Sequence, residues 1–376
     1  MQVTEATSSI SCIRMTTAEH RTLLDNHNAV IPDQVIIFGS GRWAKVYART
    51  LIAMLPSTVK VVFYSQGNAA GITGWLDSQT GSENCVATSS LEELVPFGTT
   101  VVIVANKMRS HIPTVQWAMD HHLPVLVEKP FCDDATLAGI LLSQKDVQKH
   151  IYPSHIFLFA SYLEKFKLLL DDASFTPDMI RVEWRDNNNL ERHGDVQTYD
   201  PDVPVYVDVL PHIVPILTFL TGETLFDFNS IEIQRGGAAV DIQFQLGAAC
   251  RCNISIERNA QSRTRLFELH SGQAIYALDF STEPGTIIMD GSSHTADPEW
   301  AEVKKPLQAM LEQFLCCVGG EPRDHRLDMQ TVLNGLQLIE KIRPMYAEQV
   351  SEWIKSRAGN EMDESMEYAL AEMSSS

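Results

Sequence analysis

A glycine-rich turn near the N-terminus constrains this chain more than any other feature of its sequence. The apolar run 34–38 leads into a Gly-x-Gly-x-x-Ala turn at 39–44, and helix-forming residues continue to 55. Gly39 permits a tight turn, Gly41 lets the backbone approach a pyrophosphate, and the small Ala44 lets the helix pack on the strand. The N-terminus of that helix faces the anion. The pattern predicts a dinucleotide-binding site; the alternative is a strand-to-helix turn without a ligand.

The segment that follows alternates short apolar runs with helical stretches. Apolar runs at 59–64, 100–105 and 124–127 predict strands, and the spacing of apolar residues over 111–121 predicts a helix. Strands separated by helices form right-handed βαβ units and a parallel sheet. We therefore expect an α/β protein whose residues 34–150 form a Rossmann-type, doubly wound domain, preceded by an N-terminal extension at 1–33.

After residue 150 the pattern changes to an apolar–polar alternation with period two. The segments 240–246 and 250–256 alternate in this way, and short strands are expected at 266–269 and 274–280. Such alternation with short connections predicts an antiparallel sheet with one packed face. Helical spacing returns over 305–356. We expect residues 151–357 to form an α+β domain with an open antiparallel sheet, followed by an acidic tail at 358–376.

Charge and composition argue against several classes of partner. The net charge of −19 argues against binding nucleic acid or an anionic membrane surface. The chain has no run of about 18 apolar residues that would span a membrane, and its first residues do not resemble a secretory signal. Its seven scattered cysteines fit a reducing cytoplasm. They have no zinc-ligand spacing, so we expect no metal site.

Two further segments carry polar groups suited to proton chemistry. Lys129 follows the expected strand at 124–127, at the carboxyl end where ligands bind in open α/β sheets. Asp208 and His212 are four residues apart in an apolar segment, so a helix places them on one face. A histidine oriented by a carboxylate can shuttle a proton. The alternatives are an ordinary solvated lysine and a buried structural Asp–His pair.

Three motifs, in this order, make the chain resemble the Gfo/Idh/MocA oxidoreductases. They are the turn at 39–44, Glu128-Lys129-Pro130 and Asp208-x-x-x-His212. His111 lies where that family has a histidine opening a helix, and the segment 314–342 resembles the family's closing helical region. The resemblance covers residues 34–345. It implies a Rossmann domain, an open-faced sheet used for oligomerisation, and a catalytic set of Lys129, Asp208 and His212.

The same resemblance, with the glycine-rich turn, defines the residues expected to contact the cofactor. These are Gly39, Gly41, Arg42, Trp43, Ala44, Ser65, Gln66, Asn68, Asn106, His111, Glu128 and Lys129. The segment 64–68 contains no acidic residue to accept a hydrogen bond from a ribose 2′-hydroxyl, which favours NADP(H) over NAD(H).

The chain departs from the family pattern around Asp208. Asp202-Val203-Pro204 replaces the glycine run before the aspartate, and Leu210 replaces a glycine after it. The segment 65–68 is also reminiscent of the thiazolinyl imine reductases, a branch that reduces C=N bonds.

We expect an NAD(P)-dependent oxidoreductase acting on a C–OH or C=O group of a sugar- or polyol-like small molecule, as a homodimer or homotetramer. The alternatives are an imine or ketone reductase of specialised metabolism and a catalytically silent dinucleotide-binding regulator.

Overall fold

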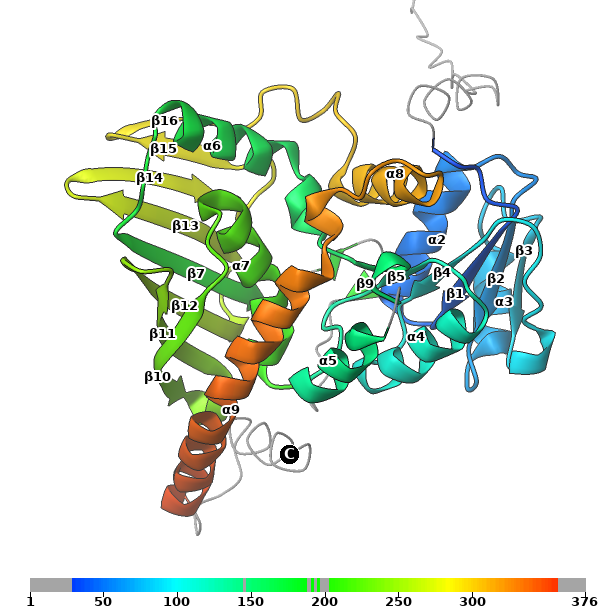
Figure 1. Ribbon diagram of the computed structural model, residues 1–376, viewed down its shortest axis with the longest axis horizontal. Coiled ribbons are helices and arrows are strands. Elements are labelled where there is room, and N and C mark those ends of the chain that lie inside the picture. The colour runs from blue at the N-terminus through cyan, green and yellow to red at the C-terminus, as the bar shows by residue number, and fades with distance from the viewer. Residues whose placement is uncertain (1–28, 145–146, 188–190, 193–194, 197–202, 358–376) are drawn as a thin grey trace, which may run out of the picture.

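The strand before the glycine-rich turn is buried along its whole length, as are β4 Thr100–Val104 and β5 Val125–Val127 of the same six-stranded parallel sheet (Figure 1). Burial on both faces is typical of parallel sheets covered by helices on both sides. The computed structural model describes residues 29–144, 147–187, 191–192, 195–196 and 203–357. The expected N-terminal extension up to residue 28 and the acidic tail therefore lie outside the described residues.

The parallel sheet has the strand order β3-β2-β1-β4-β5-β6. Its strands are β1 Gln34–Phe38, β2 Lys60–Tyr64, β3 Cys85–Thr88, β4 Thr100–Val104, β5 Val125–Val127 and β6 Ile151–Pro153. Its helices are α2 Arg42–Met54, α3 Ala69–Leu76, α4 His111–Asp120 and α5 Ala135–Ser143. The order reverses between β1 and β4, which opens a crevice at the carboxyl ends of the strands where ligands bind in such sheets.

The second sheet has eight strands in the order β10-β11-β12-β7-β13-β14-β15-β16. They are β7 Met179–Asn187, β10 Phe226–Gln234, β11 Ala239–Leu246, β12 Cys250–Ala260, β13 Thr264–Ser271, β14 Ala274–Asp279, β15 Thr286–Met289 and β16 Ser292–Thr295. All neighbouring pairs are antiparallel except β7 and β12, which run parallel. A separate two-stranded ribbon consists of β8 Glu191–Arg192 and β9 Asp195–Val196.

The helices of the second domain are α6 Ser161–Asp172, α7 Val205–Thr221, α8 Pro306–Val318 and α9 Met329–Arg357. Helices α6 and α7 lie on one face of the eight-stranded sheet, and the long α9 runs from the parallel domain along its β10 edge (Figure 1). Short 3-10 helices are η1 Leu91–Glu93, η2 Met108–Ser110, η3 Val147–Lys149, η4 Ile156–Phe159, η5 Arg235–Gly237 and η6 His325–Leu327. Among the described residues, no helix is long and apolar enough to cross a membrane.

The opposite face of the eight-stranded sheet carries charged side chains that pair along β7 and with the strands on either side of it. Arg181 lies 3.7 Å from both Glu183 and Glu268, and Arg185 lies 3.1 Å from Glu183 and 3.8 Å from Glu257. The period-two alternation arises because the residues between them, such as Ile180 and Val182, are buried against the helices.

The predicted α/β fold with a parallel and a mainly antiparallel sheet is confirmed. The parallel β7–β12 pair was not expected, because β7 precedes β12 by more than 60 residues and the local alternation does not show which strand is its partner. The parallel sheet also includes β6, which ends at Pro153, three residues beyond the expected boundary at 150.

Candidate active site

A cavity of about 950 Å³ runs from the glycine-rich turn to the N-terminal turn of α7. Side chains from both domains line it, because α7 and the end of β12 face the carboxyl ends of β1, β4 and β5. Nine of the twelve expected cofactor residues line this cavity: Gly39, Gly41, Arg42, Trp43, Ser65, Gln66, Asn68, Asn106 and Lys129. Of the three expected catalytic residues, Lys129 and Asp208 line it.

The turn itself has the geometry that a nucleotide pyrophosphate requires. Gly39 has φ +130°, and a Cβ at this position would lie 2.5 Å from the carbonyl oxygen of Ala105, so no other residue fits there. A Cβ at Gly41 would meet no protein atom within 4 Å and would instead fill space beside the cavity wall. Helix α2 begins at Arg42 without a side-chain cap, which leaves its first N–H groups for an anion.

The loop after β2 forms the adjoining wall of the cavity. The Ser65 hydroxyl donates a hydrogen bond to the Ser40 hydroxyl at 3.0 Å, which ties this loop to the glycine-rich turn. Gln66 and Asn68 line the cavity beside it. Of the lining residues that the structure describes, Asp208 is the only one with a carboxylate, and it lies at the other end of the cavity.

His111 lies beneath the cavity and connects the two loops that line it. Its Nδ1 is 2.8 Å from the carbonyl oxygen of Pro130, and its Nε2 is 3.0 Å from that of Asn106. Burial lowers the pKa of His111, although the two carbonyl groups oppose the shift. The buried Oδ1 of Asn106 has no hydrogen-bond partner in the described part of the chain. A ribose hydroxyl of a dinucleotide in the cavity would satisfy it.

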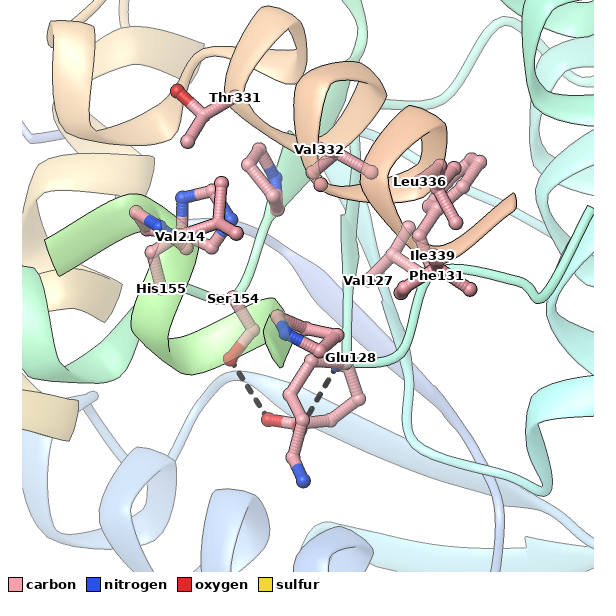
Figure 2. Close-up of a pocket in the computed structure, with 15 residues that line it drawn as sticks. Val127, Glu128, Phe131, Ser154, His155, Val214, Thr331, Val332, Leu336 and Ile339 are labelled. Atoms are coloured by element: carbon pink, nitrogen blue, oxygen red, sulfur yellow. Dashed lines mark hydrogen bonds between the residues drawn. The ribbon is translucent and has the colours of Figure 1, made fainter. Parts of the chain in front are cut away.

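Glu128 is also buried beneath the cavity and does not line it. Its Oε1 accepts a hydrogen bond from the Ser154 hydroxyl at 2.8 Å (Figure 2). The same oxygen accepts a hydrogen bond from the Tyr47 hydroxyl at 2.5 Å. Burial raises the pKa of Glu128, and these two hydrogen bonds partly oppose the rise. The structure places Glu128 and His111 beneath the residues that line the cavity, at 4% and 1% exposed, and not in its wall. Ala44 is fully buried, as expected of the small residue that lets α2 pack on β1.

A second, small cavity of about 30 Å³ lies behind Lys129, between the end of β5, α7 and α9. Apolar side chains of α9, including Val332, Leu336 and Ile339, form one wall, and Ser154 and His155 form the other (Figure 2). Burial lowers the pKa of His155 to about 4. The base of the large cavity is therefore an apolar junction between the domains.

Lys129 and Asp208 meet at the end of the large cavity that lies away from the glycine-rich turn. Lys129 Nζ lies 2.6 Å from Asp208 Oδ1 and 3.2 Å from the Asp208 carbonyl oxygen. Arg258 Nη2 lies 3.2 Å from Asp208 Oδ2. Burial alone would raise the pKa of Asp208, but the two cations outweigh it and hold the pKa well below its usual range. The carboxylate is therefore charged at neutral pH.

His212 lies on the same helix but is held by aromatic contacts. Its ring stacks on Trp184 at 5.4 Å and 17°, and it meets Phe157 edge-on at 4.9 Å. Burial and the Lys129 ammonium lower the pKa of His212 well below its usual range, so the imidazole is neutral. Asp208 was expected to orient His212 through a hydrogen bond. In the described residues the Asp208 carboxylate instead pairs with Lys129 and Arg258, and His212 has no hydrogen bond.

Sequence reasoning missed Arg258, Trp184 and Arg265. The guanidinium of Arg265 lies 3.9 Å from the centre of the Trp184 ring and pairs with Asp186. Trp184 thus separates this cation from His212. The alternation of apolar and polar residues could have indicated both arginines. Arg258 and Arg265 occupy positions of their strands that are otherwise apolar and buried, and a charged residue at such a position indicates a buried partner.

Among the described residues, no group of three or more His, Cys, Asp or Glu side chains converges as metal ligands. The cavity instead fits a nicotinamide dinucleotide. Its glycine-rich turn and uncapped helix suit a pyrophosphate, and the orphaned Asn106 Oδ1 suits a ribose. Lys129 and Asp208 line the end of the same cavity away from this turn.

No family model and no curated protein matches the sequence. Solved structures with the same fold do match. A UDP-N-acetylglucosamine 3-dehydrogenase from Acidithiobacillus ferrooxidans is 17% identical, with a TM-score of 0.66 over 84% of this chain and 98% of that one. A myo-inositol dehydrogenase from Corynebacterium glutamicum is 13% identical, with a TM-score of 0.64 over 83% of this chain and 96% of that one.

A variant of a 3-ketoreductase from Actinomadura kijaniata, in complex with TDP-benzene and NADP, is 12% identical, with a TM-score of 0.64 over 83% of this chain and 97% of that one. The likeness extends over both domains of each structure. The chain therefore has the fold of the Gfo/Idh/MocA-type oxidoreductases, as its motifs predicted.

Proposed function

We propose that this chain is an NAD(P)-dependent oxidoreductase that transfers a hydride between nicotinamide and a C–OH or C=O carbon of a small molecule. One observation carries the proposal: a single cavity joins a dinucleotide-type turn to the Lys129–Asp208 pair. The sugar- and polyol-acting enzymes with the same fold favour a sugar- or polyol-like substrate.

A nicotinamide dinucleotide would supply or accept the hydride when bound. Lys129 Nζ would donate a hydrogen bond to the substrate oxygen and move the proton that accompanies the hydride. Asp208 keeps that ammonium in place from α7, at 2.6 Å. The neutral imidazole of His212, next to them on α7, would accept or return the proton.

We propose further that NADP(H) is preferred. The wall formed by Ser65, Gln66 and Asn68 offers hydrogen-bond donors, and no carboxylate there would repel a 2′-phosphate. Arg42 lines the same part of the cavity and adds positive charge. The NADP in the ketoreductase structure of this fold supports the proposal.

The test is transfer of deuterium from C4-deuterated NADPH into a panel of keto-sugars and keto-polyols, followed by mass spectrometry. We expect one deuterium in the product of at least one substrate, and transfer slowed by about a hundred-fold or more in the His212→Ala variant. Binding of NADPH without transfer to any substrate would favour a silent dinucleotide-binding regulator, and transfer only to cyclic imines would favour an imine reductase.

A further inference from the structure

Glu128, Tyr47 and Ser154 bring three oxygen atoms into mutual contact beneath the large cavity. The Tyr47 hydroxyl lies 2.5 Å from Glu128 Oε1, the Ser154 hydroxyl lies 2.8 Å from the same oxygen, and the two hydroxyls lie 2.7 Å apart. All three distances are those of O–H···O hydrogen bonds. Tyr47 belongs to α2, whereas Glu128 and Ser154 directly follow β5 and β6, so the contacts join three elements of the parallel domain.

The number of protons available to these contacts depends on the charge of Glu128. The positions of the oxygens fix the contacts but not which oxygen carries each proton. An ionised carboxylate only accepts hydrogen bonds, and each hydroxyl has one proton to donate. Two hydroxyl protons cannot serve three contacts. With an ionised Glu128, one pair of oxygens would therefore lie at hydrogen-bond distance with no proton between them, and the two atoms would repel each other.

A protonated Glu128 supplies the missing proton. Its Oε1 then donates to one hydroxyl, that hydroxyl donates to the other, and the second hydroxyl donates back to Oε1, which closes a ring. The other carboxyl oxygen, Oε2, remains a carbonyl oxygen and accepts a hydrogen bond from the Lys129 backbone N–H at 3.2 Å. Every oxygen of this buried group then has a hydrogen bond, as buried polar groups normally do.

The surroundings of Glu128 also favour the uncharged acid. Burial raises the pKa of Glu128, and the Lys129 ammonium and the two hydroxyls only partly oppose the rise. In the described part of the chain Glu128 has no ion pair, since the Lys129 ammonium pairs with Asp208. His155, beside the adjoining small cavity, is neutral because burial lowers its pKa to about 4. A buried carboxylate without a paired cation is costly, and a carboxylic acid avoids this cost.

We propose that Glu128 is an uncharged carboxylic acid at neutral pH, that it closes a ring of three hydrogen bonds with Tyr47 and Ser154, and that its Oε2 positions Lys129. The effect on Lys129 rests on the proposed function, whereas the protonation of Glu128 does not. The ring connects α2, which begins at the glycine-rich turn, to the segment that carries Lys129. Because Glu128 is uncharged, it leaves the Lys129 ammonium to Asp208.

Infrared spectroscopy of the protein without cofactor or substrate tests the protonation directly. The carbonyl stretch of a protonated carboxyl group is separate from the bands of a carboxylate. We expect the wild-type protein to show this stretch at pH 7, carbon-13 labelling of the glutamate carboxyl groups to shift it, and Glu128→Gln to remove it. Glu302→Gln, at an exposed position, is the matched control and should retain it. Absence of the stretch from the wild type, or its persistence in Glu128→Gln, would overturn the inference.

The pH dependence of unfolding gives a second readout. The folded-state pKa of Glu128 is raised above its unfolded value of about 4. The stability that the protonated group contributes is therefore fully present below the unfolded pKa and is lost as the pH rises through the folded-state pKa. Between the two values, the ratio of the folding constants of wild type and Glu128→Gln should fall about ten-fold per pH unit. Urea unfolding at pH 5.5 and 6.5 measures this ratio, and a ratio that does not change would mean that Glu128 is ionised.

Turnover tests the positioning of Lys129. Glu128→Gln keeps a carbonyl oxygen for the Lys129 N–H, whereas Glu128→Met is similar in length and has no such acceptor. We expect kcat of Glu128→Gln to exceed that of Glu128→Met by about ten-fold, the worth of one hydrogen bond, with the same Kd for NADPH. Melting temperatures show whether each variant remains folded. Equal kcat in the two variants would overturn the positioning role. Absence of hydride transfer by the wild type would instead refute the proposed function, and the infrared result would be unaffected.

Discussion

Lys129 Nζ lies 2.6 Å from Asp208 Oδ1 and 3.2 Å from the Asp208 backbone oxygen. The contact joins the end of β5 in the parallel domain to the first turn of α7 in the second domain. It also closes the base of a cavity whose far end is the glycine-rich turn. The position of the ammonium therefore depends on the packing of both domains, and this geometry makes Lys129 the centre of the proposed chemistry.

Removal of the proton-handling groups should affect turnover far more than folding. We expect Lys129→Met and His212→Ala each to lower kcat by about a hundred- to ten-thousand-fold, the usual contribution of a general acid or base. His212→Ala should leave the Kd for NADPH unchanged, whereas Lys129→Met should weaken it, because Lys129 lines the cofactor cavity. Steady-state kinetics and NADPH fluorescence titration measure the two effects.

The matched control is His294→Ala, because His294 lies exposed on β16. It should leave kcat unchanged. A His212→Ala variant with a lower melting temperature but nearly normal kcat would assign His212 a structural role only.

Asp208→Asn should destabilise the protein in a pH-dependent way. Burial raises the pKa of Asp208, but Lys129 and Arg258 lower it by more, so the folded-state pKa lies below the unfolded value of about 4. Such a carboxylate contributes stability above its unfolded pKa and loses it as the pH falls towards the folded-state pKa. We expect the substitution to lower the free energy of unfolding by about 1–3 kcal/mol at pH 7.

Urea unfolding at pH 7 and below pH 4 measures this difference, which should shrink at the lower pH. Asp290→Asn in the exposed β15–β16 turn is the control and should have little effect at either pH. A difference that does not change with pH would mean that the charge of Asp208 does not contribute to folding.

The cofactor preference should reverse when an acid is placed after β2. Ser65→Asp puts a carboxylate beside the glycine-rich turn, where it would accept a hydrogen bond from a ribose 2′-hydroxyl and repel a 2′-phosphate. We expect the wild-type protein to bind NADPH more tightly than NADH, and the variant to bind NADH more tightly. Ser65→Asn is the uncharged control. Wild-type affinity for NADH that equals or exceeds that for NADPH contradicts the proposed preference.

The open face of the eight-stranded sheet should form a subunit interface. Its paired charges, such as Arg185 with Glu183 and Glu257, offer complementary groups to a second copy. We expect light scattering to give a mass of at least twice 42.0 kDa, and Ser255→Arg, in the middle of this face, to reduce it. Ser356→Arg on α9 should not. A wild-type mass of one chain at micromolar concentration would refute this interface.

Local sequence patterns predicted the parts of the structure that depend on local chemistry. The turn at 39–44, the strands around it and the helix that carries Asp208 and His212 depend on glycines, apolar periodicity and residues close in sequence. Nine of the twelve expected cofactor residues consequently line the cavity.

The features that the sequence did not predict depend on distant partners. Glu128 bonds to Tyr47, which is 81 residues away, and this partner buries a side chain expected at the cofactor. Arg258 lies near the end of β12, which pairs in parallel with β7, and its Nη2 lies 3.2 Å from Asp208 Oδ2. Its place among the apolar positions of β12 indicates a buried partner, but the sequence does not show which residue that partner is.

We propose that the cavity beside the glycine-rich turn binds a nicotinamide dinucleotide. A Cβ at Gly41 meets no protein atom, so Gly41→Val should leave the fold intact while its side chain enters the space of the pyrophosphate. Gly74→Val on α3, whose Cβ also meets no atom, is the matched control. The decisive measurement is titration with NADPH followed by fluorescence. We expect NADPH to bind saturably to the wild-type protein and to Gly74→Val, and not to bind to Gly41→Val. Equal binding to all three proteins would mean that this turn does not hold the dinucleotide.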